Sequence, residues 1–192
     1  MKKSIVYLII VVSIVVAIAI CFSWSENSAN FDARNATFKV ENTPVTLVDG
    51  VAEVALASIP GAKITTRYFG HELKHDLDND GREDLVFLVT QTGGGSGTFF
   101  YVVAVLDTVN GHVGSDSYFL GDRIAPQSVN LDEGVTVRET LRDNVIVVNY
   151  AVRKPDEPMT VAPSVGESVW LKLDPVTLKF GEVAQDFEGE SR

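Results

Sequence analysis

The stretch Asp76-Leu77-Asp78-Asn79-Asp80-Gly81-Arg82-Glu83-Asp84, followed at once by Leu85-Val86-Phe87-Leu88-Val89, joins an acidic loop directly to an apolar strand. Four aspartates in so short a loop would repel one another, and a hard cation removes that repulsion. Calcium fits this role because it takes about six to eight oxygen ligands. We therefore predict a Ca2+ site in this loop. Its predicted ligands are the carboxylates of Asp76, Asp78, Asp80 and Asp84 and the backbone carbonyl of Arg82.

The spacing of the acidic residues separates this loop from other acidic motifs. The pattern D-x-D-x-D-G-x-x-D resembles the calcium loops of FG-GAP, VCBS and integrin-type repeats, which lead into a strand; the resemblance covers about a dozen residues and implies a metal site without an activity. An EF-hand would place Glu at the twelfth position, where this chain has Phe87. Gly81 should adopt a positive φ so that the loop can turn. A solvated acidic turn without a metal is the alternative.

The N-terminal segment predicts a membrane anchor. Residues 5–24 are almost wholly apolar and follow Lys2 and Lys3. About 20 apolar residues match a membrane-spanning helix, so we predict an uncleaved signal anchor at residues 1–24, with the lysines in the cytoplasm and residues 25–192 outside the membrane. A cleaved signal peptide is one alternative. Lipidation at Cys21 is another, although Ile20 departs from the small residue that a lipobox requires.

The composition of the exported part limits the classes of partner that it can bind. The chain has a formal net charge of −10, and removing the positive charges of Lys2 and Lys3 leaves −12 on residues 25–192. This balance disfavours nucleic acid and anionic lipid surfaces and favours cations. The single cysteine lies in the apolar segment, so the exported part has no disulfide and depends on its core, and on a metal where one binds, for stability.

Residues 37–192 are predicted to form one β-rich domain, joined to the anchor by a tether at residues 25–36. Segments 85–90 and 98–106 are apolar on both alternating faces, which indicates two central strands buried on both faces and paired as an antiparallel hairpin through the glycine-rich residues 91–97. Asp49-Gly50 predicts a hairpin of residues 45–48 with 51–54. Further strands are predicted at residues 64–73, 113–120, 135–140, 145–152 and 168–173.

These patterns predict a mainly β fold: an antiparallel sandwich or partly open barrel with few short helices, preceded by one N-terminal transmembrane helix. The segments Arg67-Tyr68-Phe69-Gly70 and Gly121-Asp122-Arg123-Ile124 resemble those of bacterial envelope-anchored proteins to which no activity is assigned. That resemblance implies export and a β-rich domain and brings no catalytic residues.

The sequence leaves two main candidate functions. The first is a membrane-anchored extracytoplasmic calcium-binding module with a structural role or a role in binding an envelope protein or a glycan. The second is an envelope hydrolase with a polar pocket near His71, Asp122 and Arg123, for which the sequence offers no nucleophile and base at a recognisable spacing. A pilin-like subunit is a third reading, but the chain lacks the Gly-Phe processing site and the early Glu of such proteins.

Overall fold

The computed structural model describes residues 31–56, 60–132 and 143–183. One compact unit begins at Ala33 and includes the short 3-10 helix η1 (Ala33–Asn35), so residues 33–36 of the predicted tether belong to it. The described part of the chain is mainly β and its strand pairs are antiparallel. None of its helices is long and apolar enough to cross a membrane. The predicted anchor at residues 1–24 and the predicted strand at 135–140 lie outside the described residues.

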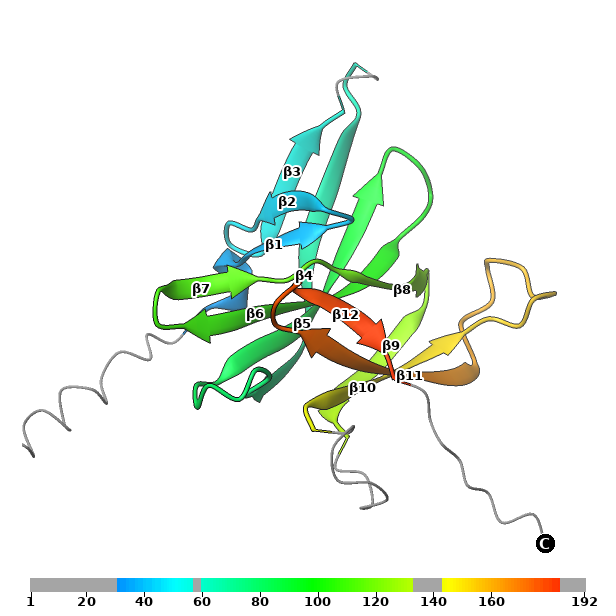
Figure 1. Ribbon diagram of the computed structural model, residues 1–192. Coiled ribbons are helices and arrows are strands. Elements are labelled where there is room, and N and C mark those ends of the chain that lie inside the picture. Colours follow the sequence, from blue (N-terminus) through cyan, green and yellow to red (C-terminus); the bar gives the residue numbers. More distant parts are fainter. Residues whose placement is uncertain (1–30, 57–59, 133–142, 184–192) are drawn as a thin grey trace, which may run out of the picture. The chain divides into compact units, whose positions relative to one another are not determined.

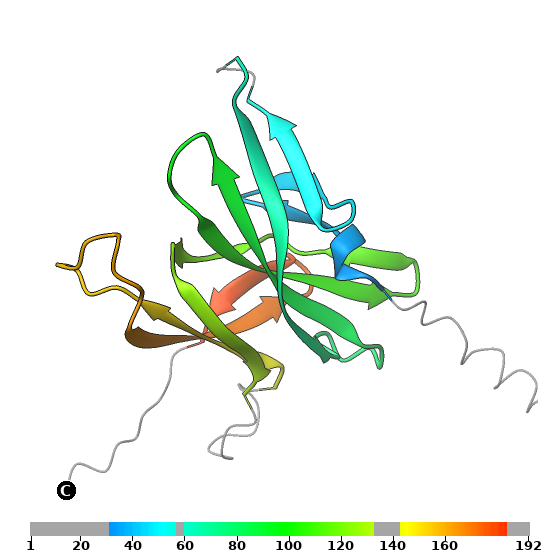
Figure 2. The same ribbon diagram turned by 180° about the vertical axis from the view of Figure 1, so that it is seen from behind.

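The larger sheet holds the predicted central strands. Figure 1 shows β7 and β8 at successive positions along one edge of β6, where each pairs with a different end of that strand. Figure 2 shows β4, coloured cyan to green, running the length of this sheet. Its strand order is β3 (Val51–Ala55), β4 (Lys63–His75), β5 (Asp84–Gly93), β6 (Phe99–Thr108) and β7 (Gly111–Gly114), with β8 (Tyr118–Asp122) also paired to β6.

Two smaller sheets complete the fold. The four-stranded sheet has the order β12 (Lys179–Glu182), β11 (Val165–Asp174), β10 (Val145–Val152) and β9 (Ala125–Leu131). The two-stranded sheet consists of β1 (Thr37–Val40) and β2 (Thr43–Thr46). The sheets keep open edges and do not close into a barrel.

The main core lies between the larger sheet and the four-stranded sheet. Even-numbered residues of β5 and β6 face this core, where Leu88 and Val102 are both 0% exposed. Odd-numbered residues point to the opposite face, since side chains alternate along a strand. There Phe87 meets Phe38 of β1 edge to face, with ring centroids 5.8 Å apart. The central strands are therefore buried on both faces, as their continuous apolar sequence predicted.

The Asp49-Gly50 turn forms, but the predicted hairpin does not extend from it. Both residues have positive φ, 50° and 85°, as a two-residue hairpin turn demands. Val48 and Val51 exchange backbone hydrogen bonds across the turn, and they form only an isolated bridge. Beyond it the chain segments separate, so the predicted pairing of residues 45–48 with 51–54 is wrong.

A second tight turn explains why these strands separate. Glu41 and Asn42 have φ of 51° and 66° and join β1 to β2, so that β2 pairs with the strand that precedes it in the chain. The backbone of Gly50 is also engaged elsewhere: its N–H donates to the Arg34 carbonyl, and its carbonyl accepts from the Tyr68 N–H. The turn therefore passes the chain from the small sheet to the edge of the large one.

The predicted strand at residues 113–120 is divided into β7 and β8. Between them, Ser115 N–H donates to the Ala104 carbonyl, whereas the next N–H, of Asp116, donates to Leu178 next to the four-stranded sheet. Gly114 permits a close crossing at this point, since a Cβ there would lie 2.0 Å from the Thr37 carbonyl oxygen. The chain thus switches partners at a position that the apolar pattern does not mark.

Candidate metal site

The acidic loop occupies residues 76–83, between the end of β4 and the start of β5. The last three residues of β4 pair in continuous register with the first three of β5, and His75 pairs with Asp84. Two residues with positive φ fold the loop back, Asn79 at 64° and Gly81 at 86°. The positive φ predicted for Gly81 is confirmed.

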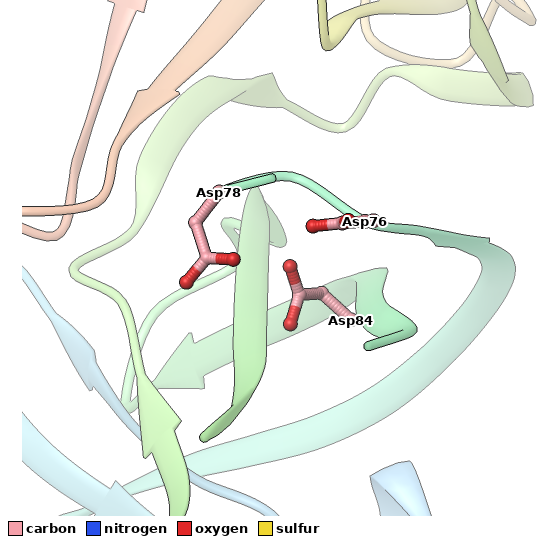
Figure 3. Close-up of side chains that lie close together, drawn as sticks. All are labelled: Asp76, Asp78 and Asp84. Carbon is pink, nitrogen blue, oxygen red and sulfur yellow. The ribbon is translucent and has the colours of Figure 1, made fainter. Parts of the chain in front are cut away.

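Three carboxylates of this loop gather around one space. Asp76, Asp78 and Asp84 each offer an oxygen atom, and these atoms lie within 4.8 Å of one another. Figure 3 shows the three side chains converging from the loop and from the first residue of β5. Such an all-oxygen group of anionic ligands suits a hard cation.

Backbone hydrogen bonds hold the carboxylates in place. Asp76 accepts from the N–H groups of Asp80 at 3.1 Å and Gly81 at 2.8 Å, while Asp78 accepts from Asp80 at 3.1 Å. These short-range bonds to the main chain are typical of aspartate in tight turns. The loop is therefore preorganised by its own side chains.

Asp84 is the most constrained member of the group, with only 1% of its surface exposed. Its Oδ2 accepts from Leu77 N–H and its Oδ1 accepts from Asp107 N–H, both at 2.8 Å. An ionised carboxylate offers about four lone-pair positions, so two remain for a cation. Asp84 thus joins the loop to the end of β6 and still presents oxygen to the shared space.

The three carboxyl groups have different proton affinities. Burial raises the pKa of Asp84 from 3.8 to about 6, helped by the charges of Asp78 and Asp80, although backbone hydrogen bonds from Leu77 and Asp107 oppose the rise. Burial, then the charge of Asp80, raises the pKa of Asp78. For Asp76 burial also acts upward, but backbone hydrogen bonds outweigh it and the pKa falls. A cation in the shared space would relieve the unfavourable charge on Asp84 and Asp78.

Asp80 and Arg82 lie differently from the other predicted ligands. Asp80 is not among the three gathered carboxylates; its Oδ1 accepts from Arg82 N–H at 2.9 Å and its Oδ2 pairs with the Arg82 guanidinium. Arg82 Nε donates to the Asp107 carbonyl at 2.8 Å. Ligation by Asp80 and by the Arg82 carbonyl stays a prediction.

Two residues that support the loop were not identified from the sequence. Asn144 donates from Nδ2 to the Leu77 carbonyl at 3.0 Å, and its Oδ1 lies 3.0 Å from His75 Nε2. Asp107 contributes its backbone N–H to Asp84 and its carbonyl to Arg82. No local sequence pattern connects Asn144 or Asp107 to the loop, because these residues lie far from it in the chain.

The residues of the alternative polar pocket are only partly brought together. Asp122 and Arg123 form an ion pair at 2.7 Å and line a cavity of about 330 Å³. His71 is not among the residues lining that cavity; it has a φ of 54° and stacks on Phe69 with ring centroids 5.7 Å apart. The cavity lining that the structure describes includes no Ser, Thr, Cys or His.

No family model, curated protein or solved structure matches this chain.

Proposed function

We propose that this protein is a membrane-anchored extracytoplasmic module whose acidic loop binds one Ca2+, with a structural role or a role in binding an envelope partner. The observation that carries the proposal is the convergence of Asp76, Asp78 and Asp84 oxygens within 4.8 Å. The anchor and its orientation rest on the apolar residues 5–24 behind two lysines.

The surroundings of the loop support a structural role for the ion. Asp84 is buried, and it accepts hydrogen bonds from Leu77 in the loop and from Asp107 at the end of β6. Neutralising its charge would therefore stabilise the junction of β5 and β6. Leu77 is 4% exposed and belongs to the main core. A cation at this loop would therefore act on the packing of the core and on the two central strands.

Calcium is favoured over magnesium by the chemistry of the donors. Magnesium demands near-ideal octahedral geometry and retains several waters, whereas calcium accepts irregular sets of carboxylate and carbonyl oxygens. The three aspartates lie in a loop shaped by its own Asx turns, which offers oxygens at irregular positions. The dissociation constant of extracellular calcium modules is about 0.1 to 1 mM.

Thermal unfolding of the full-length protein in a non-ionic maltoside detergent tests the proposal. Calcium that binds only the folded loop stabilises it by about 2.7 kcal/mol at a hundredfold excess over its dissociation constant. We therefore expect millimolar Ca2+ to raise Tm relative to chelator, and Mg2+ to have a much weaker effect.

Two variants identify the loop as the source of that effect. Asp78→Ala should abolish the calcium-dependent shift, because it removes one of the three gathered carboxylates. Glu83→Ala is the matched control, since it removes an exposed loop carboxylate that lies outside the group. Identical melting curves of the unmodified protein in calcium and in chelator would show that residues 76–84 are only a solvated acidic turn.

A further inference from the structure

A cavity of about 330 Å³ lies outside the metal loop, where the connection from β8 to β9 meets the residues that follow β10. Its volume is at the lower end of the range for small-molecule sites, which is about 300 to 1,000 Å³. Its walls combine apolar and charged side chains. The lining residues are Leu120, Gly121, Asp122, Arg123, Ile124, Val152, Arg153, Lys154, Pro155, Glu157 and Met159.

The charge of this cavity is opposite to that of the chain. The whole protein carries −10, whereas the lining contains three basic and two acidic residues and so has a net charge of +1. The acidic residues are ion-pair partners of the basic ones: Asp122 pairs with Arg123 at 2.7 Å and Glu157 with Lys154 at 3.9 Å. One positive charge is left to attract an anion.

Arg123 is held rigidly at the wall. Its backbone has a φ of 51°, an uncommon conformation for arginine, and its N–H donates to the Thr98 carbonyl at 2.7 Å. Its Nε and Nη2 donate to Asp122 Oδ2 at 2.9 and 2.7 Å. Asp122 Oδ1 accepts from Thr98 N–H at 2.8 Å. Both side chains of this ion pair are thereby fixed relative to β6 and β8.

Arg153 is fixed by backbone carbonyls. Its Nη1 donates to the Arg123 carbonyl at 2.7 Å, and its Nε donates to the Val161 carbonyl. These bonds leave Arg123 Nη1 and Arg153 Nη2 without a protein acceptor among the described residues. Because no buried side-chain nitrogen there lacks a partner, both atoms reach solvent. Each arginine therefore presents an unused guanidinium nitrogen.

We propose that this cavity binds a small monocarboxylate with an apolar body. Guanidinium groups bind carboxylates through charge-assisted hydrogen bonds, and two fixed arginines lose little entropy on binding. The apolar walls of Leu120, Ile124 and Val152 receive the rest of the ligand. A single net positive charge matches a monoanion and not a phosphate dianion. This site lies outside the calcium loop and does not depend on its metal.

Ligand-observed NMR of the full-length protein in maltoside micelles tests the proposal, with hexanoate as the probe and empty micelles as the blank. Hexanamide has the same apolar body without the charge, so it should bind at least about tenfold more weakly. Inorganic phosphate should bind more weakly than hexanoate as well. Adding chelator should leave hexanoate binding unchanged, which separates this site from the calcium loop.

Variants assign the binding to the cavity. Arg123→Gln should weaken hexanoate binding by about tenfold or more. Arg67→Gln, on the exposed side of β4 and away from the cavity, is the control and should leave binding unchanged.

Several results would overturn the proposal. They are equal binding of hexanoate and hexanamide, tighter binding of phosphate than of hexanoate, full affinity in a folded Arg123→Gln variant, or no hexanoate binding up to about 10 mM.

Discussion

Asp84→Asn should reveal how strongly the fold opposes a charge at the candidate metal site. Asp84 is 1% exposed, and its pKa rises from 3.8 to about 6, mainly because of burial. A difference of about two pKa units corresponds to about 3 kcal/mol between the protonated and ionised forms. Asparagine has nearly the same shape but never carries that charge.

The direction of the pH dependence follows from the raised pKa. Without metal, the folded state binds the Asp84 proton more tightly than the unfolded chain does. Its stabilising contribution is therefore complete below pH 3.8 and is lost as pH rises through about 6. The free energy of unfolding of the unmodified protein, minus that of Asp84→Asn, should fall by about 3 kcal/mol in total from well below pH 3.8 to well above pH 6 and stay low at pH 7.5.

Calcium should reverse this trend. Above pH 6 the ionised Asp84 can bind the ion, and a hundredfold excess over the dissociation constant restores about 2.7 kcal/mol to the unmodified protein. The asparagine variant should gain much less from calcium, because its amide offers one neutral oxygen in place of an ionised carboxylate. One buried N–H, of Leu77 or Asp107, also faces the amide nitrogen in this variant, which lowers its stability with and without calcium.

Urea unfolding of the full-length protein at a series of pH values between 4 and 8 measures both effects. Metal-free buffer should replace chelators in the acidic samples, because protonation weakens a chelator. Asp156→Asn removes an exposed carboxylate from a loop and serves as the control for the loss of one carboxyl group. If the Asp84→Asn difference did not change with pH in metal-free buffer, the buried charge would not be the source of strain at this site.

Two further predictions concern the anchor and the crossing of β1 over β7. The full-length protein should stay in the membrane fraction after an alkaline carbonate wash, with external protease digesting residues 25–192; a soluble mature form would identify residues 1–24 as a cleaved signal instead. Gly114→Ala should destabilise the fold by about 3 kcal/mol or more in urea unfolding, because its Cβ would lie 2.0 Å from the Thr37 carbonyl oxygen. Gly166→Ala, with no atom within 4 Å of its Cβ, should change stability by less than about 0.5 kcal/mol, and an equal effect of the two would contradict this account.

Local patterns alone were enough to predict the central hairpin. Residues 85–89 of β5 and 99–106 of β6 are apolar without interruption, and the structure buries both faces of these strands. The glycine-rich connector and the Gly81 turn were predictable for the same reason, since backbone conformation depends on neighbouring residues. The spacing of Asp76, Asp78 and Asp84 likewise predicted that they lie close together, whereas Asp80 of the same loop pairs with Arg82.

Pairing between distant segments was not predictable in this way. The Asp49-Gly50 turn has the predicted dihedral angles, yet β2 pairs with β1 and β3 pairs with β4. A turn specifies only the direction of the chain, whereas the partner of a strand depends on which other edges are available when the sheets assemble. Local sequence therefore predicted the bend correctly and the hairpin wrongly.

An acidic loop that precedes a strand buried on both faces was predictable from the sequence, because spacing and apolar continuity are properties of consecutive residues. The burial of Asp84 against Asp107 and the contact between Arg123 and Arg153 at a cavity became evident only in the folded chain. Burial and hydrogen bonding between segments about 20 to 30 residues apart depend on how sheets pack, since sheet packing brings side chains together that no local periodicity relates.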